Sequence, residues 1–293
     1  MFKRIGLFLL TNLLVILTVS LILNVALPMM GIRPEGITGL AIMCGLFGMV
    51  GAFISLALSR FMAKSVYKIK IIQPNDPDFR LREVYNMVAK LARQAKLPAI
   101  PEVGIYESAE PNAFATGPTK SKSIVAFSTG LLASMDKQEV EAVAGHEISH
   151  IANGDMVTMT LLTGIANALV MFLSRIIAFA IDNALRDDDG DGGLGFFAYI
   201  MVVMFLETFF MLLASIPIAA FSRYREFRAD AGAAKLTSPR EMANALRSLS
   251  RVAEVPTRKD SFAIAKISSN RKVSIFSTHP SIADRIAKLE KMI

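Results

Sequence analysis

Cysteine is nearly absent from this sequence, since Cys44 is the only one among 293 residues. A disulfide framework within the chain is therefore excluded. Cys44 also lies inside a long apolar run, so we expect no cysteine in a metal site. Histidine is scarce as well, with three residues. Any metal site must therefore combine these few histidines with carboxylates.

A basic soluble face bearing aromatic residues, as nucleic-acid-binding proteins have, is also missing. The net charge is +7, but most of this excess comes from lysines and arginines that flank apolar runs. We therefore expect no nucleic-acid partner.

Charge is absent from two long segments near the amino terminus, Ile5–Leu27 and Ile37–Leu58. Each is longer than the roughly 18 to 20 residues that cross a bilayer. A cleaved signal peptide is the alternative for the first segment, but the run is too long and no small-residue cleavage site precedes Pro28. We interpret both as retained transmembrane helices, in line with a mean hydropathy of +0.46.

Two later segments carry one charge each: residues 157–181 contain Arg175, and residues 194–221 contain Glu207. An acidic, glycine-rich turn separates them, which is typical of a transmembrane hairpin. The alternative is a pair of long buried helices in a soluble core, because charges inside a span are rare. We expect Arg175 near the outer end of its helix and Glu207 near mid-membrane, so we do not predict that they pair. Glu207 either faces another helix or is protonated.

Basic residues cluster beside the first, second and fourth segments: Lys3, Arg4, Arg60, Lys64, Lys68, Lys70, Arg223, Arg225 and Arg228. The positive-inside rule then places both termini and the polar segments in the cytoplasm. We expect two transmembrane helices in residues 1–62, part of a cytoplasmic domain in 63–155, the hairpin in 156–221, and the rest of the domain in 222–293.

The polar segments indicate an α+β domain. Helices are expected over residues 81–95, 222–235, 239–253 and 281–292. Short strands are expected over 102–106 and 123–127, joined by a turn-rich stretch at 111–120. The predicted fold class is a mainly α-helical integral membrane protein with four transmembrane helices and this cytoplasmic domain.

Two of the three histidines, His146 and His150, stand four residues apart, with Glu147 beside the first. Positions i and i+4 share one helical face, so both imidazoles can reach one metal ion while Glu147 polarises a bound water. Asp136 and Glu139 form a capping box that starts a helix, and Gly154 is a typical stop. The pattern predicts a zincin-like metalloprotease helix, with a surface helix bearing coincidental histidines as the alternative.

A catalytic zinc usually has three protein ligands. The best carboxylate candidate is Glu226, with Asp230 on the same helical face to support a ligating histidine. The alternative is a surface salt bridge with the nearby arginines.

The histidine motif, Asn112–Gly117, His150–Asp155 and Arg225–Phe227 with Asp230 together resemble the HtpX family of bacterial membrane proteases. These proteases are related to the CaaX prenyl proteases among the gluzincins. The resemblance covers nearly the whole chain.

The resemblance implies one zinc ion per chain, held by His146, His150 and Glu226, with Glu147 as general base and acid. It also implies that Asn112–Ala115 forms an edge strand beside the cleft, where Asn112, Ala113 and Phe114 contact the substrate. An ordinary turn residue is the alternative for Asn112. His279 is either a catalytic hydrogen-bond donor in the transition state or a helix-cap neighbour. Arg225 stabilises an oxyanion or pairs with a phospholipid or an aspartate.

The function that the resemblance implies is stress-linked cleavage of misfolded or damaged proteins of the bacterial inner membrane by a zinc metalloendopeptidase. The alternatives are a dedicated processing peptidase and a non-catalytic metal-binding membrane protein. Expected partners are membrane-protein substrates and the lipid bilayer, with a homo-oligomer or other membrane quality-control proteases as further candidates.

Overall fold

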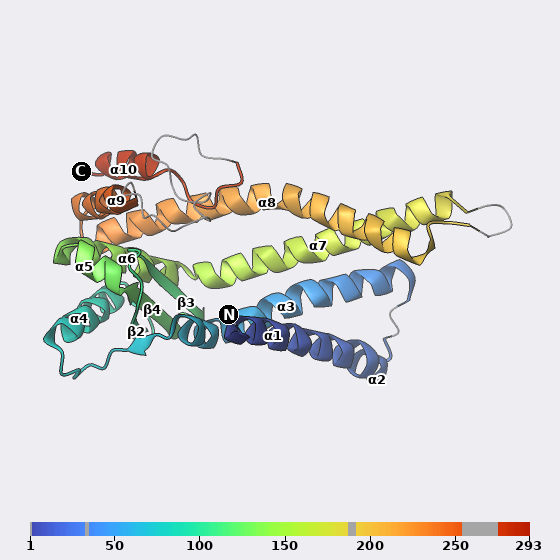
Figure 1. The fold of residues 1–293 in the computed structure, drawn as a ribbon, viewed down its shortest axis with the longest axis horizontal. Coiled ribbons are helices and arrows are strands. Elements are labelled where there is room, and N and C mark those ends of the chain that lie inside the picture. The colour runs from blue at the N-terminus through green and yellow to red at the C-terminus, as the bar shows by residue number, and fades with distance from the viewer. Residues whose placement is uncertain (1, 33–34, 187–191, 254–274) are drawn as a thin grey trace. The chain divides into compact units, whose positions relative to one another are not determined.

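A computed structural model describes residues 2–32, 35–186, 192–253 and 275–293 (Figure 1). The chain divides into two compact units. Unit 1 comprises Met1–Ser55 and Met159–Ile218, and unit 2 comprises Leu56–Thr158 and Ala219–Ile293.

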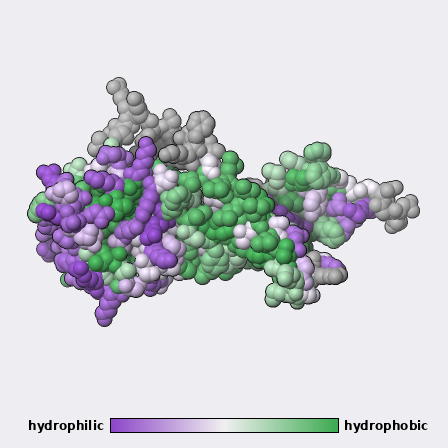
Figure 2. Space-filling model, turned by 90° about the horizontal axis from the view of Figure 1, so that it is seen from below, coloured by the Kyte–Doolittle hydropathy of each residue, from purple (hydrophilic) through white to green (hydrophobic). Residues whose placement is uncertain are grey.

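Unit 1 is built from long apolar helices. The first is α1 (Phe2–Leu21), which continues through a π-helical turn, η1 (Ile22–Ala26), into α2 (Leu27–Met29). The others are α3 (Gly36–Tyr67), α7 (Asp155–Ala184) and α8 (Gly195–Leu236). Within the described ranges, four helical segments are long and apolar enough to cross a membrane, as predicted. Hydrophobic side chains cover these helices on the face that Figure 2 shows.

Small residues bring α3 and α7 into close contact. A Cβ atom added to Gly48 would lie 2.7 Å from the backbone nitrogen of Ala168 and from the carbonyl oxygen of Gly164. Without a hydrophobic driving force in lipid, such close approach is what holds membrane helices together.

Arg175 and Glu207 form an ion pair, with Nη1 of the arginine 2.6 Å from Oε1 of the glutamate. The expectation that they lie at different depths was therefore wrong. The helix α7 extends to Ala184, beyond the apolar run. Arg175 thus lies about 14 Å from that end, and Glu207 about 18 Å from the start of α8 at Gly195. Two long side chains bridge the remaining offset.

Unit 2 contains a four-stranded sheet in the order β1-β2-β4-β3. Its strands are β1 (Lys70–Ile71), β2 (Glu102–Tyr106), β3 (Ala113–Thr119) and β4 (Lys122–Ser128). β2 and β4 are parallel, and the other two pairs are antiparallel. The strands predicted over 102–106 and 123–127 are confirmed.

The prediction of a turn-rich stretch over 111–120 was wrong, because most of it forms β3. Gly117 and Pro118 are typical turn residues, but an edge strand tolerates both. Gly117 adopts a φ of +145°, and a Cβ atom there would lie 2.3 Å from the carbonyl oxygen of Lys122. The edge strand that the family resemblance implied is present.

The described residues of unit 2 form five further helices: α4 (Phe79–Gln94), α5 (Thr129–Ser134), α6 (Lys137–Asn153), α9 (Pro239–Ala253) and α10 (Ile282–Glu290). The helices predicted over 81–95, 239–253 and 281–292 are confirmed, and residues 222–235 are helical as the last part of α8. α6 packs against α4, α9 and the sheet. Its buried residues Ile148 and Ile151 join Leu91, Phe127 and Leu246 in the core, which fixes the orientation of the helix.

Candidate metal centre

The helix α6 presents His146 and His150 side by side. The side chain of Asp136 accepts a hydrogen bond from the Glu139 backbone N–H (2.9 Å), and the Glu139 side chain accepts one from the Asp136 N–H (3.2 Å). Gly154 ends the helix in the left-handed conformation, with φ 71°. Both predicted caps are therefore present. The Nε2 atoms of the two histidines lie 3.0 Å apart.

Glu226 on α8 meets both imidazoles. Its Oε2 lies 3.6 Å from Nε2 of His146, and its Oε1 lies 3.4 Å from Nε2 of His150. One ligand atom from each of the three residues lies within 4.8 Å of the others. The Glu226 side chain is only 3% exposed. The structure thus brings together the three predicted ligands from two distant parts of the sequence.

Two further carboxylates, those of Asp230 and Asp155, lie beside the Nδ1 atoms of the imidazoles. Asp230 Oδ1 lies 3.0 Å from Nδ1 of His146, and Asp155 Oδ2 lies 2.6 Å from Nδ1 of His150. When each Nδ1–H donates to its carboxylate, Nε2 remains directed at Glu226. Asp230 occupies the position predicted for it. Asp155 was not predicted as a site residue, although the run His150–Asp155 was among the motifs that carry the family resemblance.

Arg285 on α10 supports Asp230 and was missed entirely. Its Nε and Nη2 donate to the two carboxylate oxygens of Asp230 at 2.8 Å and 2.6 Å. Its Nη1 lies 3.8 Å from Oε2 of Glu226, and the side chain is 11% exposed. Nothing in the local sequence distinguishes this arginine from the other basic residues of the amphipathic helix.

The cluster attracts positive charge. Burial alone would lower the pKa of His150, but its hydrogen bonds with Asp155 and Glu226 outweigh burial and raise the pKa to about 9. The pKa of His146 is raised in the same way, because Asp230 and Glu226 outweigh the effect of burial. The imidazoles thus lie in a field of carboxylates that favours a cation between them.

Glu147 is buried next to the ligand pair. The pKa of Tyr106 on β2 is raised, mainly by burial, and the charge of Glu147 adds to this effect while Asn112 opposes it. The ring of Tyr106 packs against those of Tyr67 and Phe114. It was not predicted as a site residue, because a tyrosine at the end of a buried strand has no distinctive sequence signal.

Asn112, Ala113 and Phe114 lie at the start of the edge strand. The carbonyl oxygen of Asn112 accepts a hydrogen bond from the Ser128 N–H at 2.9 Å. Ala113 packs against the core, and the ring of Phe114 contacts Tyr67 and Tyr106 with centroids 5.2 and 5.7 Å apart. Their role in binding a substrate stays a prediction.

His279 and Arg225 both approach Glu226. His279 Nδ1 lies 3.2 Å from Oε2, and the histidine side chain is 59% exposed. The Arg223 side chain donates to the carbonyl oxygens of Ile275 and Ser277, which holds the segment before His279. Arg225 Nη2 lies 3.7 Å from Oε1 of Glu226 and its Nε lies 4.0 Å from Asp155. Arg225 therefore lies at ion-pair distance from two carboxylates, but its buried Nε has no hydrogen-bond partner among the described residues, and its role stays open.

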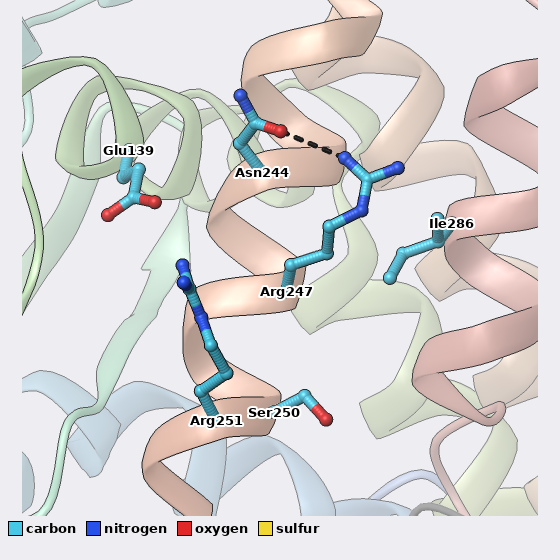
Figure 3. A pocket seen from close by; sticks show the side chains of 6 residues that line it. All are labelled: Glu139, Asn244, Arg247, Ser250, Arg251 and Ile286. Atoms are coloured by element: carbon cyan, nitrogen blue, oxygen red, sulfur yellow. Dashed lines mark hydrogen bonds between the residues drawn. The ribbon is translucent and has the colours of Figure 1, made fainter.

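A separate hollow of about 640 Å³ in unit 2 shares no residue with this cluster (Figure 3). Its cations already have partners: Arg247 binds Asn244 and Glu290, and Arg251 donates to Ser248. Ser248 in turn donates to Glu139. The hollow therefore borders a polar network that ties α9 to the start of α6.

Comparison with known proteins identifies the family. Residues 79–293 match Peptidase family M48. Protease HtpX of Aeromonas hydrophila is 47% identical over 292 residues, covering 98% of this chain and 99% of that protein. A Protease HtpX homolog of Bacillus licheniformis is 42% identical over 298 residues, with the same coverage.

A solved structure shares the fold. Ste24p of S. mikatae superimposes with a TM-score of 0.61 at 19% sequence identity, covering 96% of this chain. This chain spans 65% of the length of Ste24p. The match confirms the predicted class of a mainly helical membrane protein with an α+β domain, and the family excludes the non-catalytic alternative. This chain therefore belongs to peptidase family M48 and, within it, to the HtpX proteases, which are membrane metalloproteases.

Proposed function

We infer that this protein is a zinc-dependent endopeptidase of the bacterial inner membrane that cleaves misfolded or damaged membrane proteins under stress. The observation that carries this proposal is the grouping of His146, His150 and Glu226 within 4.8 Å. We further infer that this site and both termini face the cytoplasm, because basic residues flank the apolar segments on that side.

The donor set fits zinc. Two imidazoles and one carboxylate form the usual ligand set of a catalytic zinc site that keeps one position open. Asp230 and Asp155 engage the far nitrogens of His146 and His150 at 3.0 and 2.6 Å, as the outer partners of zinc ligands do. His146, His150 and Glu226 would therefore hold one zinc ion per chain. When bound, zinc supplies a Lewis acid that polarises the scissile carbonyl and lowers the pKa of water.

The protein's own side chains transfer protons and orient the metal ligands. Glu147, buried beside His146, takes a proton from the attacking water and delivers it to the leaving amine. Asp230 and Asp155 keep the imidazoles oriented, and Arg285 holds Asp230.

His279 and the edge strand contact the substrate. The exposed ring of His279, 3.2 Å from Glu226, donates a hydrogen bond to the oxyanion. The outer edge of β3 pairs with an extended substrate backbone, and Asn112, Ala113 and Phe114 contact it.

The two helices that carry the metal ligands run on into apolar segments, and this supports membrane proteins as the substrates. Gly154 alone separates α6, with both histidines, from α7, a candidate membrane span. Glu226 lies on α8, whose earlier part is an uncharged run except for Glu207. Both ligand helices are thus continuous in sequence with apolar segments, which favours a site at the membrane surface. A dedicated processing peptidase would share this arrangement.

The test uses full-length protein in lipid vesicles, mixed with several unrelated membrane proteins in native and destabilised forms. We expect one zinc per chain, and cleavage of the destabilised forms that a chelator stops and zinc restores. Glu226→Gln should lose zinc and activity, whereas the control Glu241→Gln on α9 should retain both. Cleavage of one protein only, in either form, would favour a processing peptidase. Full cleavage by Glu226→Gln would contradict the metal assignment.

A further inference from the structure

Unit 1 contains a cavity of about 700 Å³ lined by α3, α7 and α8. Most of its lining is apolar, but it includes Asn167, Glu207, Thr208 and Ser215. The hydrocarbon core of a bilayer is about 30 Å thick, and Glu207 lies about 18 Å along α8 from Gly195. By the same rise, Thr208 lies about 20 Å along α8 and Asn167 about 18 Å along α7 from Asp155, so these groups lie at the depth of the lipid tails. Ser215, about 30 Å along α8, lies near the far headgroups.

The charges at this cavity are already balanced. Arg175 Nη1 binds Oε1 of Glu207 at 2.6 Å and the carbonyl oxygen of Met171 at 3.0 Å. The two charged side chains remain 27% and 33% exposed. A further cation or anion would leave an unpaired charge in the hydrocarbon, which is costly. The cavity therefore favours a neutral occupant.

The remaining polar groups are suited to hydrogen bonding with such an occupant. Thr208 and Ser215 donate to carbonyl oxygens of their own helix, so their hydroxyls are left to accept. Among the residues that the structure describes, the Asn167 amide makes no hydrogen bond, and it is partly exposed at the cavity. An unbonded amide in lipid costs free energy that a polar partner recovers.

We propose that this cavity binds a neutral hydrogen-bonding side chain, an amide or a hydroxyl, carried by the transmembrane helix of a substrate. This proposal rests on the proposed function and specifies what the protease recognises. A correctly assembled membrane protein buries its polar transmembrane residues against partner helices. A misassembled one presents them to lipid, and the cavity would distinguish the two states.

The test measures binding without cleavage. Full-length Glu147→Gln protein in phosphatidylcholine vesicles carries a photo-crosslinking residue at Met211, which lines the cavity. The probes are two transmembrane peptides, one of leucine and alanine only and one with a single central asparagine. Interhelical hydrogen bonds in membranes contribute about 0.6 to 1.7 kcal/mol, so we expect roughly three- to fifteenfold more crosslinking of the asparagine peptide.

Two substitutions identify the groups responsible. Asn167→Leu should remove the preference, and Thr208→Val should reduce it. The matched control is Asn24→Leu, because Asn24 bonds within its own helix, to Ser20, and does not line the cavity. Equal crosslinking of both peptides to the parent protein, or a preference that survives Asn167→Leu, would overturn the proposal. If the crosslinking residue at position 211 reacts mainly with a second copy of this chain, the proposal is overturned in favour of an oligomer contact. Because this binding requires neither zinc nor cleavage, its outcome is independent of whether the proposed protease activity holds.

Discussion

Asp230 should contribute both to metal affinity and to the stability of unit 2, and Asp230→Asn separates the two effects. The substitution preserves shape but removes the charge that faces Nδ1 of His146 at 3.0 Å and Arg285 at 2.6 Å. Loss of an outer carboxylate typically weakens metal binding 10- to 100-fold, or about 1.4 to 2.7 kcal/mol.

The effect on stability arises from Arg285. Its side chain is 11% exposed, and a buried charge that loses its partner costs about 3 to 5 kcal/mol. Glu226 remains 3.8 Å away, so we expect the lower end of this range. The melting temperature of a domain of this size changes by about 2 to 4 °C per kcal/mol, so that of the metal-free variant should be about 6 to 12 °C lower than that of the metal-free wild type.

Asp155→Asn is the matched control. It removes an equivalent bond, at 2.6 Å to His150, but the cation beside Asp155 in the structure, Arg225, is 4.0 Å away. Zinc affinity is measured by competition against a chelator, and stability by thermal unfolding in detergent. Unfolding is measured at about pH 10, above the pKa of about 9 that Asp155 and Glu226 give to His150, so that His150 is neutral and Arg285 is the buried cation that loses its partner. Both variants should bind zinc 10- to 100-fold more weakly, and Asp230→Asn alone should show the large loss of stability. Adding Arg285→Met to Asp230→Asn should restore stability without restoring zinc affinity. Unchanged zinc affinity in Asp230→Asn, or equal destabilisation of both variants, would refute the reasoning.

Three further predictions test the packing within each unit. Asp136→Ala removes the cap of α6 and should lower the stability of unit 2 by about 1 kcal/mol in denaturant unfolding; an unchanged midpoint would show that the capping box is dispensable. Gly48→Ala should lower the stability of unit 1 by about 1 to 3 kcal/mol, since the added Cβ meets backbone atoms at 2.7 Å. Gly45→Ala is its control, because no atom lies within 4 Å of that Cβ, and equal effects would contradict the α3–α7 contact. Arg175→Leu and Glu207→Leu should each destabilise unit 1 more than the double variant does, because each leaves one charge unpaired; additive losses in a double-mutant cycle would argue against the pair.

The local features of the site could be predicted from sequence because they depend on short-range spacing. The interval from His146 to His150 matches one helical turn, and the capping box and Gly154 mark the ends of that helix. The apolar spans were equally clear, since the bilayer demands a minimum length. Glu226 could be proposed because its spacing to Asp230 repeats the same helical interval.

The failures concern features that short-range spacing does not determine. Arg285 stands 55 residues from Asp230 in sequence, so only the tertiary fold brings them together. The ion pair of Arg175 and Glu207 depends on where α7 ends, a boundary that hydropathy alone placed a few residues early. The strand β3 was missed because residues that form turns elsewhere are tolerated at the edge of a sheet.

Cleavage by the Glu147→Gln protein is the most direct test of the central claim, that His146, His150 and Glu226 hold a zinc ion at which Glu147 transfers protons. The protein is purified in full length, its zinc content is determined, and cleavage of a destabilised membrane protein is measured beside wild type. The glutamine preserves the size of the side chain and cannot take a proton from water. We predict one zinc per chain and no cleavage. Cleavage at the wild-type rate by the zinc-loaded variant would contradict the account.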